Sequence, residues 1–452
     1  MATFTIDKTD WARGVSITEN HNDGGFSPLK RGHNLSVAQG GILFPKPVGV
    51  DLAGATVVAP IIAFTADPSF LGNDAYGLDT GGNFYTVDGA TVTKRQTDAV
   101  KTYTSGTSHL KTFAGSLFAT SGTDIAKLDG SDLASIDHDW WTTTSGESAL
   151  QSSYRHPMEV VEGTLYIADQ YRIHTYDGST TVYEAMVFPT IYNITSMIVH
   201  TDGRHLLVFV AETANFSHTA RARAKLFMID TVNLEFVREI DIDGQVEGVI
   251  NVGGVIYCTY GNNLGYFNGD GLTFLRKLAN ATTYSHNLAN MEGTLLVRET
   301  NGLLAYGNLG LGNVFWYPWD NAWAVTAIYY AGDNCVMTSS SDEKLSKLDF
   351  DTYGASGIWD SNQYSFAGKV WIRKIVVESE TLESGGNITF SSINKNGTSA
   401  TIGTLTFAAD GAISEKTMTC NIYTDLFRLR IAFDALNTKG IRKITIHYED
   451  GE

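Results

Sequence analysis

Residues 115–130 read Gly-Ser-Leu-Phe-Ala-Thr-Ser-Gly-Thr-Asp-Ile-Ala-Lys-Leu-Asp-Gly, and this frame recurs along the chain. It contains a turn glycine, an apolar-aromatic strand, a second turn, a second strand and an Asp-Gly hairpin turn, where glycine tolerates a positive φ. Further copies begin at Gly163, Gly254 and Gly293, and the last of them is one residue shorter. Such a repeat indicates a propeller, a solenoid or an array of small units.

The spacing of these copies indicates which architecture is present. They begin 48, 91 and 39 residues apart, and the longest step leaves room for one more copy. A four-stranded propeller blade takes about 40–45 residues, and seven units over residues 54–350 average about 42. We therefore predict an all-β fold with a β-propeller body of seven blades, each of four antiparallel strands. A strand near Ala55–Pro60 should pair with the last blade and close the ring.

Three regions outside the repeat differ in composition. Residues 1–53 are rich in glycine and do not match the frame, so we expect an extended N-terminal arm ahead of a propeller at 54–351. Residues 352–368 are rich in Gly, Ser and Asn, which predicts a linker. Residues 369–452 carry about six alternating strands, which predicts a small antiparallel β-sandwich.

One strand of this sandwich, Leu426–Phe433, shows the alternation most clearly. Arg428 and Arg430 should share one face of the strand, because successive side chains point to opposite sides. The inward face should carry the apolar set Phe427, Leu429, Ile431 and Phe433.

Net charge and hydropathy restrict the partners. The formal net charge is −17, which argues against direct binding to nucleic acid or anionic membranes, since both require a positive field. No apolar run reaches about 18 residues, so we expect no membrane insertion. The first residues lack the basic-then-apolar pattern of a signal peptide.

Three cysteines in apolar strand patterns are expected as buried free thiols, which favours synthesis in a reducing cytosol: Cys258, Cys335 and Cys420.

Three segments resemble catalytic or ligand-binding motifs only in part. Glu239–Ile250 matches an EF-hand loop at several positions but ends in isoleucine, where calcium requires a bidentate carboxylate. Gly307–Gly312 lacks the third glycine and the helix of a dinucleotide site. In Asp137-His138-Asp139, alternation should direct the histidine away from both carboxylates. We therefore predict no catalytic residues, no metal ligands and no cofactor.

Two aromatic clusters are candidate contact residues. They fall at or just after the outermost strand of a blade, and they contain Trp140, Trp141, Trp316 and Trp319. Exposed tryptophan stacks on sugar rings or anchors protein interfaces. The alternative is that these side chains fill the apolar space between neighbouring blades. Both interpretations stay open at this point.

A glycosidase is not excluded, because two opposed carboxylates could come from different blades. However, the sequence lacks the Ser-x-Asp-x-Gly-x-Thr-Trp box of sialidase-type propellers and the Trp-Asp repeat of WD40 propellers. Both differences argue against an enzyme and against a eukaryotic scaffold.

The two ends of the chain resemble a known class of proteins. Gly24–Pro28, Arg31–Leu35 and Gly40–Phe44 look like the start of structural proteins in tailed-bacteriophage virions, and Gly440–Glu449 is similar to the final strand of small β-sandwiches in that class. Phage tail nozzle proteins contain propellers. The resemblance implies an extended arm, a β-rich body and a role in assembly, and it carries over no functional residue.

The first hypothesis is therefore a non-enzymatic virion structural protein in the tail or in a tail- or vertex-attached structure. It would be made in the host cytoplasm, and its partners would be other virion proteins and copies of itself, with the arm as part of the interface. The second hypothesis is a propeller that binds or cleaves carbohydrate, such as a host-surface glycan. A third is a bacterial propeller scaffold for protein partners.

Overall fold

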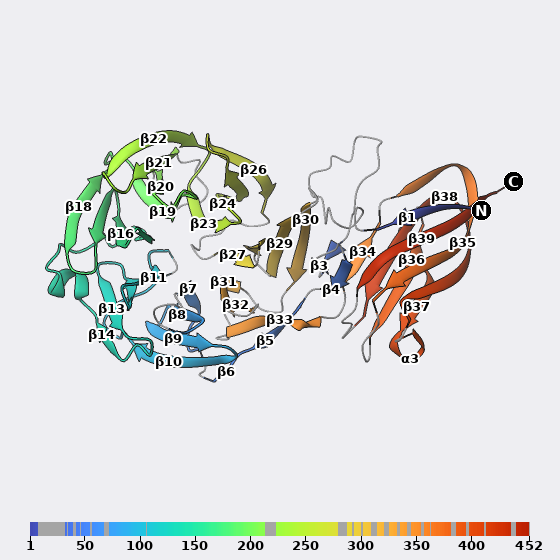
Figure 1. Cartoon of the computed structure of the whole chain (residues 1–452), viewed down its shortest axis with the longest axis horizontal. Coiled ribbons are helices and arrows are strands. Elements are labelled where there is room, and N and C mark those ends of the chain that lie inside the picture. The colour runs from blue at the N-terminus through green and yellow to red at the C-terminus, as the bar shows by residue number, and fades with distance from the viewer. Residues whose placement is uncertain are drawn as a thin grey trace. The chain divides into compact units, whose positions relative to one another are not determined.

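The computed structural model confirms an all-β fold with a propeller (Figure 1). The structure describes residues 1–7, 32–33, 35–38, 42–45, 47–54, 57–66, 72–104, 106–212, 223–278, 287–291, 293–299, 302–308, 314–320, 325–331, 335–340, 345–353, 357–361, 363–380, 386–394, 397–410, 413–434 and 440–451. Within these ranges no helix is long and apolar enough to cross a membrane.

Contacts divide the chain into two compact units. The propeller unit consists of Asp51–Asn301 and Ala322–Lys347. The sandwich unit consists of Met1–Val50, Gly302–Asn321 and Leu348–Glu452. Strand pairing nevertheless places residues 47–51, 302–308, 314–320 and 345–353 in the last two propeller sheets, and these strands are described there.

The first sheet of the propeller has five strands. They are β7 (Ile61–Thr65), β8 (Ala75–Asp79), β9 (Asn83–Asp88), β10 (Thr91–Thr97) and β6 (Ala53–Gly54), which runs parallel to β10.

Six four-stranded sheets follow in chain order. The second is β11 (Leu110–Phe113), β12 (Ser116–Thr120), β13 (Ile125–Asp129) and β14 (Ser135–Asp137); the third is β15 (Met158–Val161), β16 (Thr164–Asp169), β17 (Arg172–Tyr176) and β18 (Thr181–Val187); the fourth is β19 (Asn193–Val199), β20 (His205–Ala211), β21 (Ala224–Asp230) and β22 (Glu235–Ile242). The fifth is β23 (Val246–Val252), β24 (Val255–Tyr260), β25 (Asn263–Phe267) and β26 (Leu272–Lys277); the sixth is β27 (Leu288–Met291), β28 (Thr294–Glu299), β29 (Gly302–Asn308) and β30 (Val314–Asp320); the last is β31 (Val325–Ala331), β32 (Cys335–Ser340), β33 (Leu345–Tyr353) and β5 (Pro47–Asp51).

The first strands of these sheets form the inner ring. Each contacts the first strand of the next sheet in the order β7, β11, β15, β19, β23, β27 and β31, and β31 returns to β7. Figure 1 shows the sheets of the propeller unit arranged around this common centre. A closed ring leaves no sheet edge at its centre, which is the property that stabilises a propeller.

Two details of the ring differ from the prediction. The first sheet has five strands where four were predicted, because β6 pairs beside Thr91 and Val92 of β10. The other six sheets have four strands each. The predicted closing strand near Ala55–Pro60 is wrong, since β5 is the fourth strand of the last sheet. Leu52 N–H donates to Leu345 O at 2.9 Å at this junction. The chain therefore closes the ring with β5 and passes alongside β10 as it enters the first sheet.

The repeated frame places its glycines as predicted. The second glycine of each full-length copy follows the third strand of its sheet and has a positive φ, with 80° at Gly130, 97° at Gly178 and 95° at Gly269. In the first sheet Gly89 takes this place, and its N–H donates to Asp74 Oδ2 at 2.7 Å. These turns need a backbone conformation that residues with a Cβ rarely adopt, which explains why glycine marks the repeat.

Apolar side chains fill the space between consecutive sheets. Between the third and fourth sheets, Tyr166 and Ile173 pack in one cluster with Leu206, Val208 and Phe227, and all five are nearly inaccessible to solvent. These wedges hold neighbouring blades in position because their contacts cross from sheet to sheet.

The sandwich unit is built on a ten-stranded sheet. Its strands are β1 (Ala2–Ile6), β2 (Gly32–His33), β3 (Leu35–Ala38), β4 (Ile42–Pro45), β34 (Ile358–Asp360), β35 (Tyr364–Ser379), β36 (Asn387–Ile393), β37 (Ser399–Thr406), β38 (Glu415–Phe433) and β39 (Ile441–Asp450), with a short helix α3 (Phe407–Asp410). The long strand β38 pairs first with β35 and then, towards its C-terminal end, with β34 and β36.

The inward face predicted for this strand is confirmed. Phe427, Leu429, Ile431 and Phe433 are at most 2 % exposed. The two arginines are on the other face and pair with the buried Asp360, most closely through Arg430, whose Nε and Nη2 donate to the carboxylate at 2.7 and 2.8 Å.

We expect Leu429→Ala to lower the free energy of unfolding of the sandwich unit by about 2–5 kcal/mol, because it leaves a cavity in a fully buried position. Arg428→Ala should cost far less, since its Nη2 is 4.0 Å from Asp360 and Arg430 supplies the close pair. Denaturant unfolding of the two variants measures this difference. Equal costs at the two positions would mean that the two faces are assigned wrongly.

The predicted arm at 1–53 is wrong wherever the structure describes it. β1 pairs with β39, β2 pairs with β34, and Ile441 of β39 pairs with Leu43 of β4. Ile6 is completely buried. The N-terminal strands complete sheets of the chain itself because the free edge of β39 offers backbone hydrogen bonds and an apolar face. The quoted stretch Gly24–Pro28 lies outside the described residues.

The predicted linker at 352–368 is also wrong in part. It contains β34 and the first residues of β35, and Trp359 within it is completely buried. Gly, Ser and Asn indicated turns there, but the single tryptophan supplies the buried surface that makes the segment a strand.

Candidate functional site

The first pair of predicted contact residues is buried. Trp140 and Trp141 begin a short π-helix, η1 (Trp140–Thr144), and are 4 % and 0 % exposed. They pack with Phe118 and Tyr176 of the second and third sheets, and Trp141 Nε1 donates to Ser148 O at 2.9 Å. The interpretation as exposed sugar or protein contacts is therefore wrong for these two, and the alternative of packing between blades is confirmed.

The second pair, Trp316 and Trp319, lies on β30, which pairs with β29 in antiparallel register. Their side chains lie outside the part of the chain whose side chains the structure describes. Their role as contact residues stays a prediction.

The segment Asp137-His138-Asp139 distributes its side chains as expected. His138 Nδ1 is 3.0 Å from Asp98 Oδ1, whereas Asp139 forms an ion pair with Lys101. Asp137 accepts a hydrogen bond from Thr144. The histidine and its flanking carboxylates thus have separate partners and form no acid–base cluster.

Two of the three cysteines are described as free thiols. Cys258 is buried and Cys420 is half-buried. Burial raises the pKa of the Cys420 thiol to about 11 and raises that of Cys258 further. Both therefore remain protonated and unreactive at neutral pH. Cys335 begins β32, but its side chain is not among those described.

A buried ion pair joins two sheets of the propeller unit. Arg155 precedes β15 of the third sheet, and Glu247 lies on β23 of the fifth. Each is 1 % exposed, their side chains form a salt bridge, and Arg155 Nη1 also donates to Glu247 O at 2.9 Å. A planar guanidinium that binds both a carboxylate and a carbonyl fixes the two sheets relative to each other.

The residue that follows Arg155 belongs to a second buried network. Asp169, at the end of β16, is 3.6 Å from His156 Nδ1 and 3.9 Å from His174 Nε2. It accepts the Gln151 N–H at 2.8 Å. Burial lowers the pKa of His156, so this ring is neutral at pH 7. Burial raises the pKa of Asp169, but the nearby His174 and His156 rings and the Gln151 N–H hold it below its ordinary value.

The side chains of this second network accept hydrogen bonds from backbone N–H groups and are inaccessible to a substrate. Both histidines are completely buried, His174 Nδ1 accepts the Glu184 N–H at 2.9 Å, and its ring stacks on Tyr183 at 4.5 Å. A general acid or base has to reach the proton that it transfers, and these rings have no path to solvent.

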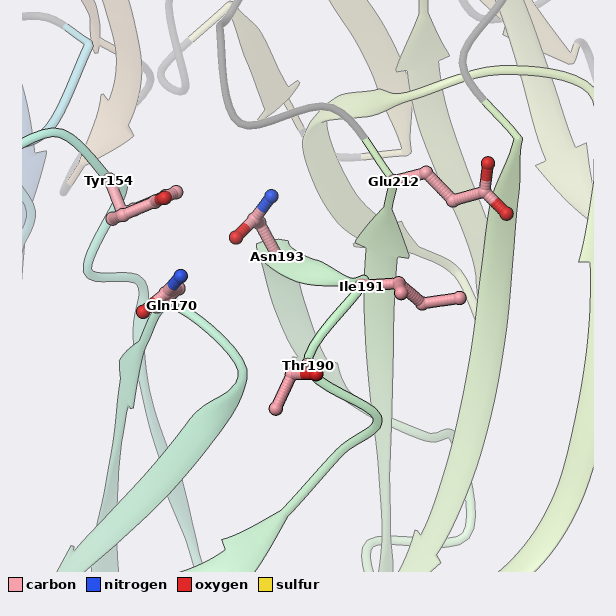
Figure 2. Close-up of a pocket in the computed structure, with 6 residues that line it drawn as sticks. All are labelled: Tyr154, Gln170, Thr190, Ile191, Asn193 and Glu212. Carbon is pink, nitrogen blue, oxygen red and sulfur yellow. The ribbon is translucent and has the colours of Figure 1, made fainter.

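A surface pocket lies between the third and fourth sheets, directly beside these networks. It has a volume of about 400 Å³. Figure 2 shows Tyr154 and Gln170 on one side, Ile191 and Glu212 on the other, and Asn193 between them. Thr190 completes the lining, and every one of the six residues comes from the end of a strand or from a connecting loop.

The buried networks fix one side of this pocket. Tyr154 directly precedes Arg155 and His156, and Gln170 directly follows Asp169. Gln170 has a φ of 56°, and its carbonyl accepts the Ile194 N–H at 2.7 Å, which joins the third sheet to the fourth. The pocket therefore presents amides and hydroxyls on a rigid frame.

The chemistry available in the pocket is hydrogen bonding. Of its six lining residues only Glu212 carries a carboxylate, and Figure 2 shows its side chain pointing away from Tyr154 and Gln170. A glycosidase uses two opposed carboxyl groups about 5–10 Å apart, and this lining supplies one. The described lining therefore offers groups that can hydrogen-bond a polar ligand.

A second polar cluster lies in the β19–β20 hairpin and the strand beside it. The Arg204 guanidinium pairs with Asp230 and, together with the Val232 N–H, lowers the pKa of this carboxyl to about 2. The unfolded chain has an Asp pKa of about 3.9. Because the folded pKa is the lower one, the stabilisation is complete above about pH 4 and is lost as the pH falls towards 2.

We therefore expect Asp230→Asn to destabilise the propeller unit at pH 7 and this difference to become small as the pH falls to about 2 and below. Thermal unfolding of both proteins across this pH range measures the effect. A difference that persists unchanged at pH 2 would show that the carboxylate charge is not its origin.

These features define a β-propeller protein with a polar surface pocket. No protein-family model matches the chain. No curated protein matches it either.

Several solved structures have a similar fold. A streptogramin B lyase is 11 % identical with a TM-score of 0.48, over 67 % of this chain and 97 % of that one. The Neurospora crassa Pan2 WD40 domain is 9 % identical with a TM-score of 0.46, over 66 % and 94 %. BamB from Moraxella catarrhalis is 13 % identical with a TM-score of 0.42, over 76 % and 98 %. At these identities the likeness concerns the fold alone.

The sequence alone did not predict the ion pair or the pocket. Arg155 and Glu247 are 92 positions apart, and no local pattern joins them. The only signal was the polar run Tyr154-Arg155-His156 immediately before an apolar strand. Polar residues at that place in a repeat lie at the end of the inner strand, where loops from neighbouring blades meet.

Proposed function

We propose that this protein is a non-enzymatic structural component of a tailed-bacteriophage virion, in the tail or in a structure attached to the tail or a vertex. Its partners are other virion proteins and copies of itself. The resemblance of its two ends to virion proteins supports the class of particle, and the outer surface of the propeller unit supports assembly as the function.

The observation that carries this proposal is a set of exposed apolar side chains on the outer rim. The outermost strands of three consecutive sheets, β18, β22 and β26, bear large apolar residues that are 49–53 % exposed, namely Val182, Val187, Phe236, Val237 and Phe274. We call these five residues the rim set. Figure 1 shows the three strands following one another along the outside of the ring.

The strands that carry the rim set are also sheet edges. Each is the last strand of its sheet, so one side of its backbone has no neighbouring strand within that sheet. Soluble proteins usually protect such edges with charge or proline and seldom gather large apolar residues there. Apolar side chains on three successive edges therefore support a protein–protein interface.

In this proposal the rim set, and not the N-terminal arm, forms the interface with partner proteins. The described strands of residues 1–53 are used within the chain's own sheets, so they offer less free surface than an extended arm. The rim set is already exposed and can contact a partner without releasing any strand from its sheet.

A rim variant tests the proposal directly. In a phage that carries Val182→Lys, Val237→Lys and Phe274→Lys together, we expect purified particles to lose the protein, because three desolvated charges oppose the interface. The wild-type protein should be present in purified particles in a fixed number of copies, as measured by quantitative mass spectrometry. Circular dichroism of the isolated variant checks that it is folded.

The matched control places three lysines elsewhere on exposed apolar positions, at Val58, Val100 and Ile413, which are 39–67 % exposed. This control should be incorporated normally. Absence of the wild-type protein from the particles, or normal incorporation of the rim variant, would contradict the proposal.

A second candidate function is glycan binding in the pocket of Figure 2. Amides, hydroxyls and one carboxylate are the groups that hydrogen-bond sugar hydroxyls. Glycan-array binding by the wild-type protein that is lost in Gln170→Ala and retained in the rim variant would favour this candidate. Hydrolysis of a bound glycan would overturn the non-enzymatic reading.

A further inference from the structure

The hairpin between β19 and β20 brings two histidines and an aspartate together. His200 N–H donates to His205 O at 2.8 Å across the hairpin, and Gly203 N–H donates to His200 O at 2.9 Å within the turn. The two histidines are therefore fixed opposite each other at the base of the turn, with Asp202 between them in sequence. The sequence does not predict this group, because its spacing fits neither a helix nor a single strand.

One carboxylate oxygen faces both imidazoles. Asp202 Oδ2 is 2.8 Å from His200 Nδ1 and 2.6 Å from His205 Nδ1, and the three atoms lie within 4.8 Å of one another. The other oxygen, Asp202 Oδ1, accepts hydrogen bonds from the backbone N–H groups of Arg204 and His205 at 2.9 Å each. The backbone thus holds the carboxylate in one orientation and leaves Oδ2 directed at the two ring nitrogens.

The contact at His200 is not an ordinary hydrogen bond. Its Nδ1 is buried and has no hydrogen bond of acceptable geometry among the described residues, although Oδ2 is 2.8 Å away. This nitrogen and the carboxylate oxygen beside it are therefore both placed to face one cation.

The charges around the three side chains and their exposure to solvent also suit the binding of a cation. The neighbouring guanidinium of Arg204 is paired with Asp230, so its charge is balanced outside the cluster. The side chains of His200, Asp202 and His205 are 22–38 % exposed, which leaves a path from solvent.

We propose that His200, Asp202 and His205 bind a divalent transition-metal ion, with zinc as the best match. Two imidazole nitrogens and one carboxylate oxygen form a borderline donor set that suits Zn²⁺, Co²⁺ and Ni²⁺ better than Mg²⁺ or Ca²⁺. Ligand distances of about 2.0–2.2 Å need only a small separation of the three atoms from their present contacts, and water completes a tetrahedral shell. The ion would join the two strands of the hairpin across the turn.

Spectroscopy of the cobalt form tests the site. Untagged protein, stripped with chelator, is titrated with Co²⁺ and then with Zn²⁺. We expect one equivalent of Co²⁺ to give visible d–d absorption and one equivalent of Zn²⁺ to remove it. Zinc should also raise the unfolding temperature of the protein, because an ion that binds only the folded chain stabilises it.

Two variants separate metal binding from folding. In Asp202→Asn the amide oxygen can still accept the two backbone N–H groups, so the turn is kept while the anionic ligand is lost. We expect this variant and His205→Gln to bind Zn²⁺ at least roughly tenfold more weakly with unchanged circular dichroism.

The matched control is His138→Gln, which alters a histidine that also contacts an aspartate, Asp98, but belongs to no such cluster among the described residues. Its zinc affinity should equal that of the wild-type protein. Failure of the wild-type protein to bind one equivalent of either metal, or equal affinity in Asp202→Asn, would overturn the proposal, and neither outcome bears on particle assembly.

Discussion

Glu247→Gln is expected to lower the free energy of unfolding of the propeller unit by about 3–5 kcal/mol. The substitution keeps the shape of the side chain and the backbone carbonyl that Arg155 contacts, but it removes the charge that balances a guanidinium only 1 % exposed. A buried charge without its partner is strongly destabilising, since no solvent replaces the lost interaction.

Denaturant unfolding followed by tryptophan fluorescence measures this effect. The matched control is Glu235→Gln, the same substitution at an exposed position on β22, which should change the free energy by less than about 0.5 kcal/mol. The double variant Arg155→Met with Glu247→Met should recover much of the loss, because an apolar pair can replace a buried ion pair at little cost. A wild-type stability in Glu247→Gln would show that the pair is not a structural tie.

The parts of the fold that the sequence predicted are those encoded locally. Gly130, Gly178 and Gly269 mark their turns because each turn requires a positive φ, and this requirement acts on one residue at a time. Strand alternation likewise predicted the buried face of β38 from Phe427 to Phe433, since burial on one face of a sheet leaves a period of two.

The errors have a common physical origin in strand pairing between distant segments. β5 and β6 differ little from an irregular stretch in composition, yet one closes the ring and the other extends the first sheet. β1 pairs with β39 from the opposite end of the chain. Such pairings depend on which sheet edges the rest of the fold leaves free, and a single sequence does not contain that information locally.

The candidate site also depends on contacts between distant segments, which the sequence does not encode locally. The sequence pointed to tryptophans because their chemistry is conspicuous, and the described pair turned out to be core. The pocket residues and the hairpin His200–His205 are ordinary polar residues whose significance comes from the loops that bring them together. Loops at the ends of propeller strands are set by the ring and not by their own residues, so position within the repeat was the only usable signal.

Trp141→Ala should cost about 3–5 kcal/mol of propeller stability, and it tests the reassignment of this residue from contact surface to core. The side chain is completely buried, its ring centroid is 5.2 Å from that of His174, and its Nε1–H bond to Ser148 is lost in the variant. Calorimetry or denaturant unfolding measures the cost. Phe274→Ala, an aromatic truncation at a half-exposed rim position, should change the stability by less than about 1 kcal/mol.

The two tryptophan interpretations then give opposite results. If Trp141 is core, the variant loses stability, and any loss of particle or glycan binding follows the fraction of protein that is unfolded. If Trp141 is a contact residue, the variant keeps its unfolding free energy and loses binding while fully folded. The contacts of Trp141 with neighbouring aromatic rings favour the first result, because an apolar wedge between blades is lost as a unit when its largest member is removed.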